Sequence, residues 1–487
     1  MSIANRIGRG VKATLGADVA RLAAKGGITL LLTRVFLEPD EYGLVFLAIA
    51  VFSIATVVGS LGIPKSTAKF LAEYREKDDA QVHHVVRISA TALAAVVVLV
   101  SLSFYFLSDW IAGVYDEPAL APLLAIGAAY IVVKVAYVYV RISFQGFGRV
   151  PLSAATTAVS SVGQLGCVVL FLSLGFGTIG AIGGYVAGYA LGVAFGAVFL
   201  GRLLREYPRS GPPESGLARR ILEYSVPLTA SQGGNLLYKR VDTLLVGFFL
   251  TPLAVGFYEL AKQVSEFVIA PANSLGFTVA PTFGEHKSGA KLERAARVYE
   301  QSFEVILLLY LPAVAGIVLL AEPGIQFVFG PAYAGAAPVL QIFSAFVLFQ
   351  ALDKITNDSL DYLGRATERA IGKGITGTLN VGLNIALIPT IGVVGAAIST
   401  AVCFAIMVTY NVYLIDCELP LDRHRMAKSI AAVSVVTGGM TAVVYAAQPY
   451  VDGLFTLFGA VAVGVFVWAV LSVAGGLLDL EEVRSQI

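Results

Sequence analysis

The sequence has 487 residues, of which 57% are hydrophobic and 14% are charged, and its formal net charge is +1. Soluble domains average about 25% charged residues, so the composition excludes an ordinary soluble protein and predicts an all-α integral membrane protein. The three cysteines lie in or beside apolar runs, and their spacing fits neither a disulfide framework nor a metal site.

Apolar runs of about 20 residues, the length that crosses a bilayer as a helix, predict about 14 transmembrane helices. They start close to the N-terminus, where a basic segment leads directly into a charged helix and no cleavable signal is visible. The predicted spans are 15–37, 42–62, 85–107, 119–144, 152–174, 178–200, 223–249, 253–276, 299–321, 336–360, 371–389, 393–415, 428–448 and 453–477.

The connections between these spans alternate in charge. All Lys and Arg residues outside the spans fall on the side that holds both termini, and the loops of the other side have none. The positive-inside rule therefore predicts that both termini are cytoplasmic, in a multi-pass protein of the cytoplasmic membrane.

The first two spans and their turn recur later in the chain. Phe36 to Ala48 and Phe249 to Ala261 align without gaps 213 residues apart and share Phe, Leu, Pro, Gly, Leu and Ala. Further short matches follow in order, such as Gly148-Arg149 with Gly364-Arg365. Since each repeat holds six spans, both repeats have the same orientation, with a site expected at their interface.

The repeat divides the chain into four predicted parts. They are an N-terminal lobe of helices 1 to 6 (1–200), a cytoplasmic linker (201–222), a C-terminal lobe of helices 7 to 12 (223–415) and two additional helices (416–487).

Charged residues inside the spans are the candidates for function. A charge at the bilayer centre costs about 2.5–3.5 kcal/mol on insertion scales, so these side chains should face a wet cavity or each other. Three groups of charges share a helix face, one on span 1, one on spans 7 and 8, and one on span 10. In addition, Lys134 is a cation in span 4, and Glu300 and Glu304 lie at the start of span 9. The members of the first three groups are Asp18, Arg21, Lys25, Lys239, Asp242, Glu259, Lys262, Lys354 and Asp358.

One interpretation is a cationic cavity for an anionic substrate, and the other is a set of salt bridges that hold the lobes together. The cavity is favoured where cations exceed nearby acids, which selects Arg21, Lys25, Lys239 and Lys262. Asp18, Asp242, Glu259, Lys354 and Asp358 are then charge partners or carboxylates that couple a proton or sodium ion. For Glu300, near a helix end, the salt bridge is favoured.

No motif indicates a cofactor, a metal or a catalytic residue. Gly175 to Gly180 fits the dinucleotide fingerprint G-x-G-x-x-G, but it joins two membrane spans rather than a strand and a helix. The glycines that follow it at every fourth position of span 6 favour close helix packing instead.

Several segments together resemble a known family. Thr33 to Gly43, Phe70 to Tyr74, Gln145 to Arg149, Arg240 to Leu245 and Phe329 to Tyr333 are similar, in this order, to segments of the polysaccharide and oligosaccharide-lipid flippases. These flippases form a branch of the multidrug/oligosaccharidyl-lipid/polysaccharide (MOP) exporter superfamily.

The resemblance implies two six-helix lobes that alternate access and carry a polyprenyl-phosphate-linked glycan from the inner to the outer leaflet. It also implies that basic cavity residues bind the phosphate, by position Arg21, Lys25, Lys239 and Lys262. Membrane lipids and the glycosyltransferases of the same pathway are the expected partners, and nucleic acid is not.

Two alternatives stay open. A cation-coupled multidrug exporter of the same superfamily would prefer an acidic or apolar cavity, against the basic excess in helices 1, 7 and 8. A membrane glycosyltransferase or polymerase acting on the same lipid usually has a sizeable outer loop, and the longest ones here, 108–118 and 322–335, are short.

Overall fold

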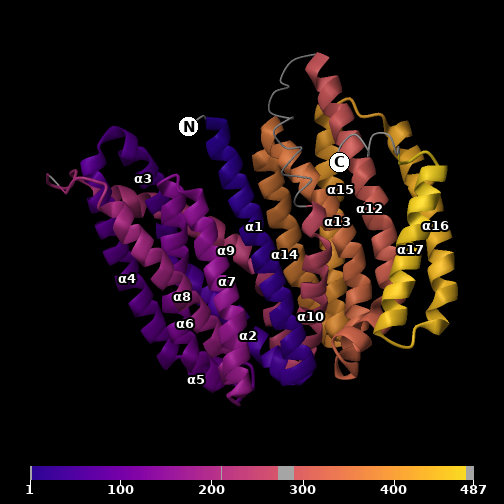
Figure 1. The fold of residues 1–487 in the computed structure, drawn as a ribbon, viewed down its shortest axis with the longest axis horizontal. Coiled ribbons are helices and arrows are strands. Elements are labelled where there is room, and N and C mark those ends of the chain that lie inside the picture. The colour runs from indigo at the N-terminus through magenta and orange to yellow at the C-terminus, as the bar shows by residue number, and fades with distance from the viewer. Residues whose placement is uncertain (1–2, 210, 273–289, 479–487) are drawn as a thin grey trace. The chain divides into compact units, whose positions relative to one another are not determined.

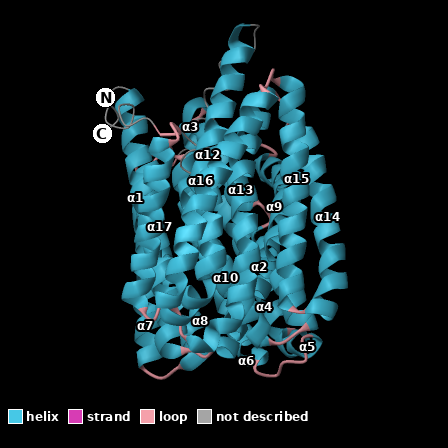
Figure 2. Cartoon of the chain, turned by 90° about the vertical axis from the view of Figure 1, so that its right-hand side faces the viewer, coloured by secondary structure: helices cyan, strands magenta, loops and turns pink. Residues whose placement is uncertain are grey.

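The computed structural model describes residues 3–209, 211–272 and 290–478, and the regular elements in these ranges are all helical (Figure 2). Up to residue 249 the helices are α1 (Ile3–Leu31), α2 (Pro39–Ser60), α3 (Ile63–Lys77), α4 (Val82–Phe106), α5 (Ser108–Val114), α6 (Leu120–Gly146), α7 (Val150–Ser173), α8 (Gly177–Leu204) and α9 (Leu217–Phe249). After residue 249 they are α10 (Pro252–Val268), α12 (Ala290–Val328), α13 (Ala337–Leu363), α14 (Ala366–Ile391), α15 (Val393–Glu418), α16 (Arg423–Ala447) and α17 (Leu454–Ala474).

The described helices confirm an all-α membrane protein. Eleven of them are long and apolar enough to cross a bilayer. The predicted spans outside this set are 15–37, 223–249 and 253–276, which correspond to α1, α9 and α10. These helices carry the candidate charges, which lower their hydropathy, and α10 has only 17 described residues. The count of 14 therefore stays a prediction.

The chain divides into two compact units, Met1–Gly256 and Phe257–Ile487. In the first unit α9 packs on α2 and α3, although the repeat assigns 223–249 to the second lobe. The predicted lobes follow the sequence repeat and not this division into units, so the lobe boundaries stay a prediction. In the second unit α16 and α17, yellow in Figure 1, lie side by side and pack on α12.

Corresponding arginines of the two repeats make similar ion pairs with glutamates near the end of the corresponding helix. Arg149, between α6 and α7, lies 3.5 Å from Glu206 just beyond α8. In the second repeat Arg365, between α13 and α14, lies 2.5 Å from Glu418 at the end of α15. Each arginine follows a glycine with positive φ, 66° in the first repeat and 85° in the second. The duplication therefore extends from the sequence to turn geometry and side-chain contacts.

The duplicated turns at the starts of α2 and α10 contact each other through glycine. A Cβ atom placed on Gly43 would lie 1.8 Å from the carbonyl oxygen of Pro252. Reciprocally, a Cβ on Gly256 would lie 2.2 Å from the carbonyl oxygen of Pro39. Each turn thus presents its glycine to the proline carbonyl of the other, and neither position has room for a side chain.

The glycines of α8 form the packing stripe that their spacing predicts. At Gly184 an added Cβ would lie 2.5 Å from the Cα of Val168 on α7, and at Gly188 it would lie 2.4 Å from the backbone nitrogen of Gln164. Backbone contact of this kind requires the absence of side chains. The buried members of the stripe are Gly180, Gly184, Gly188, Gly192 and Gly196.

Replacing Gly188 by Leu should separate α7 from α8, because the added carbons meet backbone atoms that cannot rotate away. Overpacking of this type costs about 1–3 kcal/mol, and the melting temperature of the detergent-solubilised protein should fall. A Cβ added at Gly201 on the same helix would meet no described atom within 4 Å, so Gly201→Leu is the matched control. Equal melting temperatures of the two variants would contradict the stripe.

The linker between the repeats is held against α3. The Tyr74 hydroxyl donates a hydrogen bond to the Glu214 carboxylate, and the Arg220 guanidinium donates to Glu214 (2.8 Å) and to Glu73 (3.1 Å). Burial, together with the hydrogen bond to Glu214, raises the pKa of Tyr74 to about 12. The hydrogen bond from Tyr74 and the charges of Lys77 and Arg220 lower the pKa of Glu214. We call Tyr74, Glu73, Glu214 and Arg220 the linker clamp.

The clamp should weaken in acid. Because the pKa of Glu214 is lowered from 4.5 in the folded protein, its contribution to stability is complete above pH 4.5 and is lost as the pH falls through the lowered pKa. The difference in melting temperature between wild type and Glu214→Gln should be constant from about pH 7 to 5 and vanish at lower pH. Glu223→Gln, which breaks the exposed pair with Arg219 outside the clamp, is the control for the loss of one surface carboxylate.

Candidate functional site

The α1 charges lie on one helix face, as their spacing predicts. Arg21 pairs with Asp18 at 3.2 Å, and the two side chains are 56% and 53% exposed within the structure. Lys25, one turn further along, is half-buried. Because so exposed a pair contributes only about 0–1 kcal/mol to stability, Arg21 can exchange Asp18 for another anion at little cost.

The α9 charges differ in exposure. Lys239 is exposed and Arg240 is half-buried, whereas Asp242 is only 4% exposed. The positive charge of Arg240 acts on the hydroxyl groups of Tyr130 and Tyr185, which belong to α6 and α8 of the same unit.

The α10 charges form a buried pair. Lys262 lies 3.5 Å from Glu259, and the side chains are 17% and 3% exposed. The Lys262 ammonium also lies 5.6 Å from the centroid of the Tyr258 ring. From its sequence context, Lys262 was expected to belong with the cations in excess of nearby acids, but the structure gives it a carboxylate partner. Lys262 is thus a candidate phosphate ligand whose charge is already balanced within the protein.

The α13 charges include a polar cluster that the sequence did not predict. Asp353 is 8% exposed, and it accepts hydrogen bonds from the side-chain amides of Asn357 (2.5 Å) and Asn411 (3.1 Å). Lys354, next to it, is half-buried, and the side chain of Asp358 lies outside the described part of the structure. An asparagine in the apolar run 393–415 was the available signal, because a buried amide requires partners.

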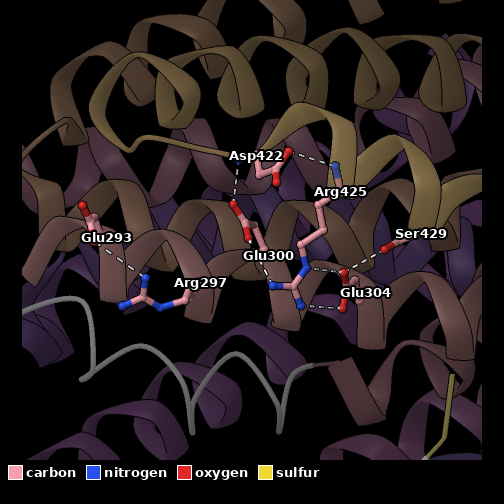
Figure 3. Close-up of polar contacts among 7 residues, drawn as sticks. All are labelled: Glu293, Arg297, Glu300, Glu304, Asp422, Arg425 and Ser429. Carbon is pink, nitrogen blue, oxygen red and sulfur yellow. Dashed lines mark hydrogen bonds and ion pairs between the residues drawn. The ribbon is translucent and has the colours of Figure 1, made fainter. Parts of the chain in front are cut away.

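Glu300 and Glu304, in the first half of α12, anchor α16 (Figure 3). Glu300 accepts a hydrogen bond of 2.8 Å from the backbone N–H of Asp422 and lies 3.8 Å from Arg425. Glu304 lies 3.2 Å from Arg425 and accepts a hydrogen bond from Ser429 (2.7 Å). These contacts agree with the salt-bridge interpretation for Glu300.

Together these charged residues indicate which kind of ligand the protein could bind. Cationic side chains of α1 and α9 belong to one compact unit, where they can bind anionic oxygen groups through charge-assisted hydrogen bonds. In the described ranges, no group of three or more His, Cys, Asp or Glu side chains could hold a metal ion.

A duplicated bundle of apolar helices, with charges inside several of them, defines a multi-pass membrane protein. Residues 19–287, more than half of the chain, match the family described as "Polysaccharide biosynthesis protein", and the chain belongs to this family.

Curated relatives are similar to parts of the chain. "Probable low-salt glycan biosynthesis flippase Agl15" of Haloferax volcanii is 31% identical over 39% of this chain and 40% of its own length. "Probable flippase AglR" of the same organism is 27% identical over 47% of this chain and 49% of its own length. These matches therefore span less than half of either relative. "Lipid II flippase MurJ" of Bacillus subtilis is 22% identical over 74% of this chain and 73% of its own length.

Solved structures establish the fold. A lipid II flippase MurJ in an inward closed conformation superimposes with a TM-score of 0.76 at 16% identity, covering 95% of this chain and 97% of that one. An inward-facing multidrug resistance MATE transporter of the MOP superfamily gives a TM-score of 0.66 at 15% identity, covering 82% and 95%. The chain therefore has the MOP-superfamily fold.

Lys262 and Arg21 should respond differently to loss of charge. Lys262→Met leaves the Glu259 carboxylate buried without this ion-pair partner, and breaking a buried pair costs up to about 3–5 kcal/mol. Arg21→Met breaks an exposed pair and should change stability by less than about 1 kcal/mol. Thermal unfolding in detergent measures both, and Glu259→Gln/Lys262→Met should recover part of the loss. A fully stable Lys262→Met would instead identify Lys262 as available to a ligand.

Proposed function

We propose that this protein is a flippase that moves a polyprenyl-phosphate-linked oligosaccharide or polysaccharide unit from the inner to the outer leaflet of the cytoplasmic membrane. The observation that carries the proposal is the set of intramembrane cations on α1 and α9 in a member of a polysaccharide biosynthesis family. The names of the Haloferax relatives and of MurJ, all flippases, support it.

The phosphate or pyrophosphate is the group that the cations would bind. Arg21, Lys25 and Lys239 offer multiple donors on two helices, and at Arg21 the substrate would displace the exposed Asp18. Lys262 would join them if the substrate competes with Glu259. The sugars would occupy the polar cavity while the polyprenyl chain stays in lipid.

Transport would follow from rocking of the two repeats around this bound head group. With both termini in the cytoplasm, a cytoplasm-negative potential favours outward movement of an anion by about 2.3 kcal/mol per charge per 100 mV. Asp18, Asp242, Glu259, Lys354 and Asp358 would balance the cavity charge or couple an ion. The protein would act as a transporter without a chemical step, on lipids made by glycosyltransferases of the same pathway.

The second candidate is a cation-coupled multidrug exporter. The observation in its favour is the pair of buried carboxylates, Asp242 at 4% and Glu259 at 2% exposure, since buried carboxylates attract cations. The likeness to a MATE transporter is compatible with it.

Proteoliposomes containing a fluorescent polyprenyl-diphosphate-linked sugar distinguish the two. Wild type should move the lipid between leaflets, and Arg21→Ala/Lys25→Ala should slow this movement at least about tenfold, because two phosphate ligands are lost. Arg219→Ala/Lys77→Ala, outside the membrane spans, is the matched control and should transport like wild type.

Two results would overturn the proposal or its site. Export of a cationic dye down a sodium gradient, without movement of the lipid, would replace the flippase by the multidrug exporter. Normal transport by a folded Arg21→Ala/Lys25→Ala variant would leave the function standing and reject the assignment of the phosphate ligands.

A further inference from the structure

Lys134, inside α6, lies in a cluster of tyrosines in the first compact unit. Its ammonium group donates a hydrogen bond to the hydroxyl of Tyr189 on α8. The same nitrogen lies 3.8 Å from the centroid of the Tyr189 ring and 5.6 Å from that of Tyr137. Cation–π contacts of this kind stabilise a charge without neutralising it.

The cluster lies inside the helix bundle and not on its outer face. Tyr130 and Tyr137 are 5% and 7% exposed, and their ring centroids lie 5.7 Å and 5.1 Å from that of Tyr189. Tyr130 also packs on Phe52 of α2 at 5.1 Å. We call Lys134, Tyr130, Tyr137 and Tyr189 the tyrosine cage.

A polar group of α7 also contacts the cage. The hydroxyl of Tyr137 donates a hydrogen bond of 3.4 Å to the hydroxyl of Thr157 on α7. The two helices of the cage, α6 and α8, both pack on α7, and α7 packs on α1, which carries Arg21 and Lys25.

The charge of Lys134 has no acidic counterpart in the described part of the chain. Its contacts there are the hydroxyl and the two aromatic rings, and no described carboxylate lies within 4.0 Å. Lys134 and Tyr189 are only half-buried, so the cage can be reached. A cation at this depth is costly unless it is hydrated or paired, which makes it a receptor for an anion.

We propose that the tyrosine cage is a subsite for an anionic oxygen group, a carboxylate or a phosphate, that is attached to a sugar of the transported glycolipid. The inference rests on the proposed flippase function and adds a specificity site to it. Lys134 binds the anionic group, and the Tyr189 hydroxyl that its ammonium contacts lies beside that group. Phosphate at the lipid end stays with Arg21 and Lys25.

Two lipid probes test the subsite in proteoliposomes. One carries a neutral glucose disaccharide on polyprenyl diphosphate, and the other carries the same disaccharide ending in glucuronate. Lys134→Met should slow transport of the glucuronate probe at least about tenfold and leave the neutral probe unchanged, because only the first presents a carboxylate to the cage. If both probes slow equally, Lys134 binds the lipid phosphate and the sugar subsite is rejected.

Controls separate the subsite from folding and from the function itself. Lys69 lies 4.2 Å from the Tyr224 ring centroid in the same unit, so Lys69→Met removes a comparable cation–π contact and should leave both rates unchanged. Lys134→Arg keeps the charge and should restore most of the glucuronate rate. In detergent, the glucuronate probe should raise the melting temperature of wild type more than that of Lys134→Gln, which tests the subsite even if Lys134→Met misfolds.

The inference fails if a folded Lys134→Met variant transports both probes at wild-type rates, or if the glucuronate probe stabilises Lys134→Gln as much as wild type. If wild type moves neither probe, the proposed function fails and the subsite fails with it.

Discussion

The contact between the two duplicated turns constrains how the helices that begin there are arranged. Gly43 and Gly256 each leave only the space of a hydrogen atom in front of a proline carbonyl of the other turn. The starts of α2 and α10 are thereby placed at backbone distance. The helix that precedes the second turn, α9, packs on α2. A side chain at either glycine would displace backbone, for which no rotamer change compensates.

The charged side chains of the bundle lie in two kinds of environment. Glu259 with Lys262 on α10, and Asp353 with its two asparagine amides, satisfy buried charge within the protein, and the hydrogen bond from Asn411 to Asp353 links α15 to α13. At Arg21 and Lys134, by contrast, the cation either has an exposed partner or lacks an acidic one among the described residues. At the second kind, an anion would not have to displace a buried partner in order to bind.

The sequence alone was sufficient for properties that follow from periodicity. Apolar length identified most of the membrane helices, and the fourth-residue spacing of the α8 glycines identified their close packing. The sequence alone was insufficient for contacts between residues that lie far apart in the chain. Helical spacing placed Lys134 inside a span, but its contact with Tyr189 links residues 55 positions apart, and no local pattern encodes that.

The role of a charged side chain also depends on its contacts and on its burial. From the sequence, Lys262 resembled Arg21, as an intramembrane cation three residues from an acid. The structure separates them by burial, with 17% exposure for Lys262 and 56% for Arg21. Exposure depends on the packing of neighbouring helices, and a single helical pattern does not contain it. Glu304 of α12 likewise has a distant partner, since it pairs with Arg425 of α16.

The reciprocity of the turn contact also bears on the history of the chain. When residue i of one copy meets residue j of the other, and j meets i, the contact is isologous, as in a two-fold symmetric dimer. Pro39 with Gly256 and Pro252 with Gly43 form such a pair of contacts. The duplication that the sequence repeat records is thus also visible as a contact of isologous form within one polypeptide. The two copies now differ in charge inside the membrane spans, since the first has Lys134 where the second has Gln350, 216 residues further along.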